Sequence, residues 1–153
     1  MGEPTAAEQF VTGFARRIVA ALAPDELVVF EPVSRAYLSD PGGVIDARSR
    51  PDAELGSGID TVVLALTPVA LSVATTVYEH LLGRATDLTG RRLVKAVKGL
   101  RKRRDPVPSG PVGAETLEET VAGVRQLVGV RTDDPRLADQ CAEVVRALLE
   151  HHA

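Results

Sequence analysis

An uncharged run of eighteen residues, from Thr61 to Tyr78, constrains the fold of this chain more than any other feature of its sequence. A helix of that length is at the lower limit of what can cross a lipid bilayer. Four threonines, a serine and a proline interrupt its valines and leucines, and an acidic residue closes each end. The run predicts an apolar helix over residues 59–82, bent at Pro68 and terminated by Gly83.

Three amphipathic segments flank this run and need a shared core. The first begins at the capping-box pattern Thr5-Ala-Ala-Glu8 and ends before Pro24, with apolar residues at helical spacing. A second capping-box pattern, from Thr116 to Glu119, predicts the start of another helix, and Asp134-Pro135 predicts the start of the last one. Because only a few residues join the last two segments, we expect them to form an antiparallel helical hairpin.

Residues 25–38 favour a helix, with a short strand as the alternative. The apolar side chains fit one face of a helix, whereas the letters LVVF are typical of strands. Pro32 lies in the middle of the segment and lacks the backbone N–H that a helix interior uses. We therefore expect a second, proline-interrupted helix here.

Two stretches rich in glycine and proline, residues 40–58 and 105–113, predict a long loop and a stiff linker. The chain then divides into a helical core (residues 1–104), the linker and a C-terminal hairpin (residues 114–153) that packs on the core. The fold class we predict is an all-α, single-domain bundle of about five or six helices around the apolar helix. The buried face of that central helix is expected to comprise Val62, Leu66, Val69, Val73 and Val77.

Three environments are open for the central helix. It is buried among the amphipathic helices, or sheathed by them and released at a membrane, or it spans a membrane permanently. A permanent span would place the two halves of the chain on opposite sides of the bilayer, and the apolar faces of their helices would then lack a shared core. Burial in a bundle satisfies every apolar face, and we favour it for that reason.

A strongly basic segment follows the apolar run. The chain carries a net charge of −3, but residues 84–104 hold nine bases and one acid, while residues 1–83 carry −6 and residues 105–153 carry −5. A helix over residues 89–104 places basic side chains on one side and Leu93, Val97 and Leu100 on the other. Such a helix is typical of segments that bind a membrane surface or a protein partner, although its charges could also pair with the acidic flanks. The residues predicted to bind a partner or lipid are Arg91, Arg92, Lys95, Lys98, Arg101, Lys102, Arg103 and Arg104.

No pattern in the sequence indicates catalysis or metal binding. His151 and His152 stand at the end of the chain, and we expect Glu79 and His80 to be exposed polar side chains at a helix end. Cys141 falls on the apolar stripe of the last helix, where it is expected to pack in the core. We therefore expect no enzyme activity, no cofactor and no metal. Nucleic acid is not an expected partner, because the basic segment has no aromatic residue on which bases could stack.

Residues 25–104 contain, in this order, ELVVFEPVSRAYLSDP, ELGSG, TPVALSVATTVYEHLL and KGLRKRR. This order resembles small accessory modules associated with bacterial defence effectors, which couple an apolar helix to a basic tail. It has no diagnostic motif and carries no residue roles across, and Pro68 and the threonines depart from a simple anchor. The excess of arginine over lysine, fifteen to three, is typical of a high-GC bacterium.

These observations lead to two functional hypotheses. In the first, the chain is a non-enzymatic adaptor or assembly module that acts through protein–protein contacts, either with a partner or by self-association. In the second, it is a membrane-acting effector, lipid-binding or pore-forming, that releases the apolar helix and uses the basic helix to find anionic lipid. The first ten residues lack the basic and apolar regions of a signal peptide, so we expect a cytoplasmic location, peripheral to the inner face of the membrane under the second hypothesis.

Overall fold

The computed structural model describes residues 3–41, 66–83, 90–102 and 111–151. Six α-helices occupy these residues, and a short 3₁₀ helix, η1 (Pro24–Glu26), joins the first two. The prediction of an all-α, single-domain bundle is confirmed. The helices are α1 (Ala6–Leu22), α2 (Leu27–Ser39), α4 (Leu66–Leu81), α5 (Gly90–Leu100), α6 (Ala114–Thr132) and α7 (Pro135–Glu150).

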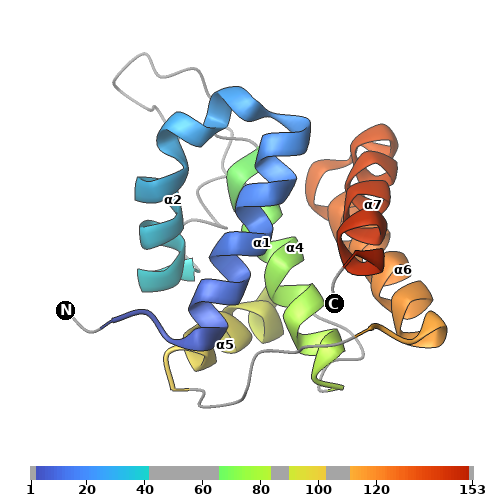
Figure 1. The fold of residues 1–153 in the computed structure, drawn as a ribbon. Helices are drawn as coiled ribbons and strands as arrows, with labels where there is room; N and C mark the ends of the chain where they lie inside the picture. Colours follow the sequence, from blue (N-terminus) through green and yellow to red (C-terminus); the bar gives the residue numbers. More distant parts are fainter. Residues whose placement is uncertain (1–2, 42–65, 84–89, 103–110, 152–153) are drawn as a thin grey trace.

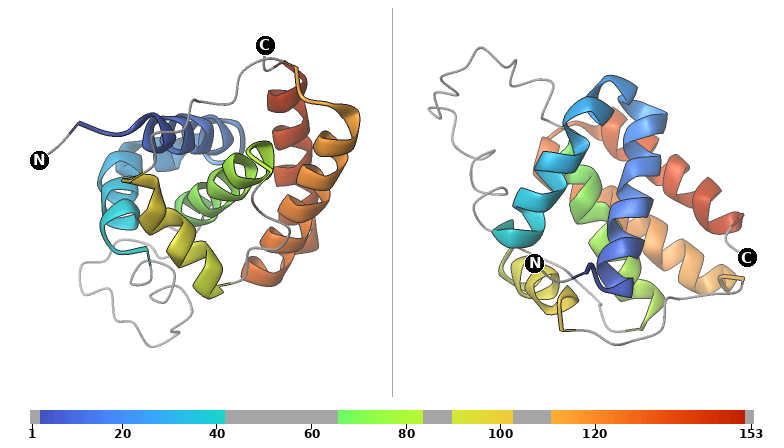
Figure 2. Two further views of the ribbon diagram at one scale, coloured as in Figure 1. Left: turned by 90° about the horizontal axis from the view of Figure 1, so that it is seen from below. Right: turned by 60° about the vertical axis from the view of Figure 1, so that its left-hand side comes forward.

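Helix α4 lies at the centre of the bundle (Figure 1), with α1 and α2 on one side and α6 and α7 on the other. Helices α1, α2, α5 and α6 all contact it, and every residue from Leu66 to Glu79 is buried. Helix α5 packs against α4 and α2, with its C-terminal end near the start of α1 (Figure 2), and α7 packs against both α6 and α1. The described part of the apolar run, from Leu66 to Tyr78, therefore lies in the core helix of the bundle, as predicted.

The predicted buried face of this helix is present where the structure describes it. Leu66, Val69, Val73 and Val77 are each at most 6% exposed, whereas Val62 and the rest of residues 59–65 lie outside the described residues. The described helix ends at Leu81, one residue before its predicted end. No helix within the described residues has both the length and the apolar character needed to cross a membrane.

Several helix boundaries follow the local sequence signals. The Thr5 side chain caps α1 and Glu8 reaches back to the Thr5 backbone, which completes the predicted capping box. The Asp134 carboxylate accepts hydrogen bonds from two amides of the first turn of α7, and Pro135 follows it. Gly83 has a φ of +68°, the left-handed conformation that glycine adopts most easily after a helix.

The second predicted capping box is wrong. Helix α6 begins at Ala114, with Gly113 as its N-cap residue and no side-chain cap. Thr116 and Glu119 therefore lie inside the helix, where the amide of residue 119 already has a backbone partner. An early start is possible because Gly113 adopts an extended backbone (φ −61°, ψ 148°), and because the helix gains apolar contacts from Leu117 onwards.

Pro32 disturbs its helix less than predicted. Residues 27–39 form one continuous helix that includes Pro32, so the strand alternative is wrong and the helix is not interrupted. Pro32 and Val28 both lie on the exposed side of α2, where water can bond the carbonyl group that proline leaves without a donor. Pro68 lies in the first turn of the described α4, and the bend at Pro68 stays a prediction because residues 59–65 lie outside the described residues.

Candidate functional site

The apolar side of α5 holds this helix against the bundle. Leu93, Val97 and Leu100 are fully buried, and Ala96 is nearly so. The Thr5 hydroxyl, which already caps α1, donates a hydrogen bond of 2.8 Å to the carbonyl oxygen of Leu100. One residue therefore satisfies a backbone group at the start of α1 and another at the end of α5, and fixes how the two helices meet.

The opposite side of α5 is a cationic face that points away from the bundle. Among the described residues, Arg101 alone of its members has an ion pair, at 3.6 Å from Glu8 Oε1, and it also donates a hydrogen bond of 3.3 Å to Ser39 Oγ. The remaining members have no ion pair or hydrogen bond with any described residue. Arg103 and Arg104 lie outside the described residues. The cationic face comprises Arg91, Arg92, Lys95, Lys98, Arg101 and Lys102, all exposed.

The acidic remainder of the chain leaves most of this charge uncompensated within the described residues. Three of its exposed acids form pairs elsewhere, Glu31 with Arg16, Asp139 with Arg125, and Glu118 with Arg146, and no other described acid except Glu8 pairs with the cationic face. In the last pair, the hydrogen bond from Arg146 lowers the pKa of the Glu118 carboxyl. The cationic face is thus a cluster of positive charge on a helix whose other side is packed in the bundle, and a field of this sign attracts anionic surfaces.

A buried carboxylate fixes the start of α4. Glu26, at the end of η1 and 4% exposed, accepts hydrogen bonds from the amides of Leu66 (3.1 Å) and Thr67 (2.7 Å) and from the Thr67 hydroxyl (2.6 Å). These amides are among those that a helix N-terminus leaves without partners, and a negative charge there also favours the helix dipole. This contact could not be predicted from the sequence, because it joins residues forty positions apart.

The polar side chains of α4 are satisfied mostly by their own helix. The hydroxyls of Ser72, Thr75 and Thr76 each donate to the carbonyl oxygen four residues earlier, at 2.9–3.0 Å. Tyr37 from α2 places its hydroxyl 3.5 Å from those of Ser72 and Thr75, and burial raises the pKa of the Tyr37 phenol despite these contacts. The threonines are therefore compatible with a dry protein core.

His80 is half-buried at the other end of α4, where it packs on α6. A Cβ atom added to Gly123 would lie 3.2 Å from the His80 Nε2, so the lack of a side chain at Gly123 makes room for the imidazole. Burial lowers the pKa of His80, although the carboxylates of Glu119 and Glu79 act in the opposite direction. The prediction of an exposed Glu79-His80 pair is wrong, because Glu79 is only 4% exposed and His80 contacts the neighbouring helix.

The residues with nucleophilic or metal-binding chemistry do not gather into a site in the part of the chain that the structure describes. Burial raises the pKa of the Cys141 thiol to about 11, so the reactive thiolate is scarce at neutral pH. No group of three His, Cys, Asp or Glu side chains there is placed to hold a metal ion. The cationic face is the most distinctive chemical feature of the described surface.

Comparison with protein-family models, curated proteins and solved structures finds no match for this chain.

Proposed function

We propose that this chain is a non-enzymatic adaptor or assembly module, and that the cationic face of α5 binds an acidic surface of a protein partner. The observation that carries the proposal is the set of five exposed cationic side chains that have no ion pair with any described residue. They stand on a helix whose apolar side is already buried, so their positions are set before a partner arrives. Preorganised charge of this kind steers association and selects partners of opposite sign.

A protein partner fits the packing of α5 better than a membrane does. Amphipathic helices bind bilayers by burying their apolar side in the lipid interface. In this bundle the corresponding side chains, Leu93, Val97 and Leu100, are already buried against other helices. Lipid binding through α5 as it stands would therefore be electrostatic alone, without the apolar contribution.

The packing of α4 also favours the adaptor over the membrane-acting effector. Release of α4 would separate Glu26 from three hydrogen-bond donors and leave a carboxylate and two amides to be resolvated. It would also expose every side chain from Leu66 to Glu79. Both changes oppose release, so the membrane hypothesis needs a trigger that overcomes them.

Two charge-matched variants of the full chain test the proposal. Lys95→Glu/Lys98→Glu reverses two charges on the cationic face, and Arg17→Glu/Arg136→Glu reverses two exposed arginines on α1 and α7. The tagged proteins are expressed in the native host, and the proteins that co-purify with each are quantified by mass spectrometry. In parallel, each purified protein is sedimented with phosphatidylglycerol vesicles at low salt.

We expect a defined partner that is lost with the α5 variant and retained with the control variant. The unmodified chain should stay in the supernatant when the vesicles are sedimented, or sediment only weakly. A set of co-purifying proteins that both variants retain equally contradicts the proposal. Strong sedimentation that only the α5 variant loses supports the membrane-acting effector instead.

A further inference from the structure

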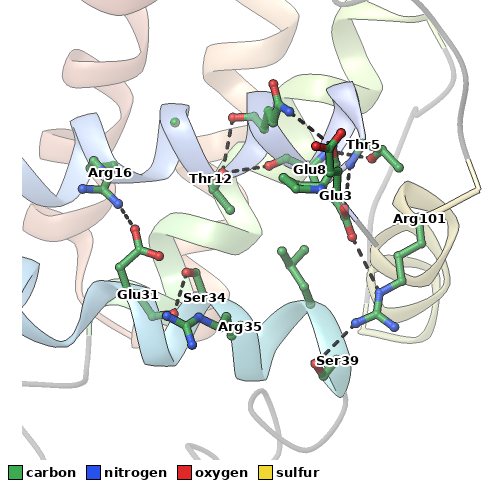
Figure 3. A pocket seen from close by; sticks show the side chains of 14 residues that line it. Glu3, Thr5, Glu8, Thr12, Arg16, Glu31, Ser34, Arg35, Ser39 and Arg101 are labelled. Carbon is green, nitrogen blue, oxygen red and sulfur yellow. Dashed lines mark hydrogen bonds and ion pairs between the residues drawn. The ribbon is translucent and has the colours of Figure 1, made fainter. Parts of the chain in front are cut away.

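A groove of about 990 Å³ lies between α1 and α2. Figure 3 shows the paired Arg16 and Glu31 at one end and Arg101, from the end of α5, at the other. Small side chains leave the space between them open, among them Thr12 and Gly13 of α1 and Ser34 of α2. A Cβ atom added to Gly13 would meet nothing within 4 Å.

Four of the six charged side chains that line the groove pair with one another, and the other two, Arg35 and Glu3, carry opposite charges. Glu31 pairs with Arg16, and Glu8 accepts a hydrogen bond of 2.8 Å from the Thr5 amide and lies near Arg101. Arg35 is exposed and has no ion pair with any described residue. Arg101 has five N–H donors and uses only part of them, so both arginines can donate hydrogen bonds to a carboxylate in the groove.

The hydroxyl groups of the groove distinguish a peptide from a simple anion. Thr12 donates its proton to the carbonyl oxygen of Glu8 at 2.9 Å, and Ser34 donates to that of Glu31 at 3.0 Å. Their oxygens therefore remain only as acceptors. A peptide N–H can donate to such an oxygen, whereas a carboxylate or a fully ionised phosphate has no proton to give.

Arg101 connects the groove to the cationic face, because it belongs to both. Its guanidinium reaches Glu8 of α1 and Ser39 of α2 while its backbone follows the last turn of α5. An acidic chain lying along α5 would therefore meet the open end of the groove without crossing an intervening helix.

We propose that the α1–α2 groove seats a carboxylate-bearing peptide segment of the protein partner, with one carboxylate on Arg35 and another on Arg101. This inference rests on the proposed function, since the same partner contacts the cationic face. A peptide N–H group bonds the hydroxyl oxygen of Thr12, whereas Ser34 is only 4% exposed. Glu3, which lines the groove and has no ion pair with a described residue, opposes the partner's charge.

The test uses a fluorescein-labelled peptide of alternating glutamate and glycine as the probe, with binding to the full chain measured by fluorescence anisotropy at low salt. Gly13→Phe fills the groove, and Gly13→Ala controls for loss of the glycine. Gly129→Phe adds the same bulk to α6, at another glycine whose added Cβ meets nothing within 4 Å. Arg35→Gln is compared with Arg17→Gln, an exposed arginine of α1 that does not line the groove.

We expect Gly13→Phe and Arg35→Gln each to weaken binding about tenfold or more. Gly13→Ala, Gly129→Phe and Arg17→Gln should bind like the unmodified chain, and Glu3→Gln should bind more tightly. Circular dichroism establishes that each variant is folded, and Arg35→Gln serves as the independent test if Gly13→Phe is not.

Two results overturn this inference. If the unmodified chain does not bind the probe, the groove does not take acidic peptides. If Gly13→Phe and Arg35→Gln bind the probe as the unmodified chain does, the probe lies elsewhere. In that case a partner lost from Lys95→Glu/Lys98→Glu still supports the proposed function, whereas absence of such a partner removes both.

Discussion

Glu26 shows how one side chain fixes the position of a whole helix. Its carboxylate lies between η1 and the first turn of α4, buried and bonded to three donors. A buried charge of this kind stabilises the fold only while its partners stay in place, because an unpaired carboxylate in the core is costly. The contact therefore ties the connection between α1 and α2 to the central helix.

We predict that Glu26→Ala lowers the free energy of unfolding by about 2–3 kcal/mol, because it leaves two buried amides and a hydroxyl without their charged acceptor. Asp25→Ala, one position earlier and exposed, should change it by less than about 0.5 kcal/mol. Urea denaturation followed by circular dichroism measures both. If Glu26→Ala lowers the free energy of unfolding by no more than Asp25→Ala does, the hydrogen bonds of Glu26 contribute nothing to stability.

His80 makes a pH-dependent contribution to stability. Burial places its pKa in the folded protein below the ordinary value of 6.5, so the unfolded chain binds the proton more readily. Stability from this group is complete above pH 6.5, declines as the pH falls below 6.5 towards the lowered folded pKa, and is constant below that.

We predict that His80→Gln reduces the loss of stability between about pH 7.5 and about pH 5.5, a range above the ordinary titration of carboxylates. His151→Gln, at the exposed end of the chain, serves as the control. Urea midpoints at a series of pH values provide the measurement. A slope that His80→Gln leaves unchanged would mean that another group causes the pH dependence.

At the scale of the helices, the caps decide where each element begins. Asp134 holds two amides of α7, at 3.0 and 3.2 Å. Thr116 has the same kind of sequence pattern but lies two residues inside α6. The two positions therefore separate a capping pattern that acts as a cap from one that does not.

We predict that Asp134→Ala destabilises the protein by about 1 kcal/mol, the usual cost of losing an N-cap. Thr116→Ala should leave stability unchanged or raise it slightly, because alanine is the better residue within a helix. Thermal unfolding of both variants under the same conditions tests the difference. A loss at Thr116 as large as that at Asp134 would restore the capping box that the structure lacks.

The elements also show what could be predicted from the sequence. Thr5, Gly83 and Asp134 act on backbone groups within a few residues, so their patterns alone identify the helix ends. Apolar spacing likewise identifies the buried side of α5, whereas α4 is buried on all sides from Leu66 to Glu79, its threonines included. Glu26 and Arg35 carry no such signal, because a cap from a distant residue and an unpaired arginine beside a groove depend on tertiary packing. The His80 contact with Gly123 depends on it in the same way.

For the whole molecule, the main structural feature is the separation of charged from apolar surface. Helix α4 is enclosed by α1, α2, α5 and α6, while α5 presents its charged side outward. A bundle with this arrangement keeps its hydrophobic surface inside and offers charge to its surroundings. We therefore predict that the molecule keeps its fold while it binds a partner.

The most direct test of this claim is to crosslink the cationic face to whatever it contacts in the native host and to measure the mass of the adduct. A photo-crosslinking amino acid replaces Lys98 in the full chain, and in a control it replaces Glu143, an exposed residue of α7. We predict a discrete adduct with the mass of a protein at position 98 and none at position 143. An adduct with the mass of a phospholipid at position 98, without a protein adduct, would contradict the account.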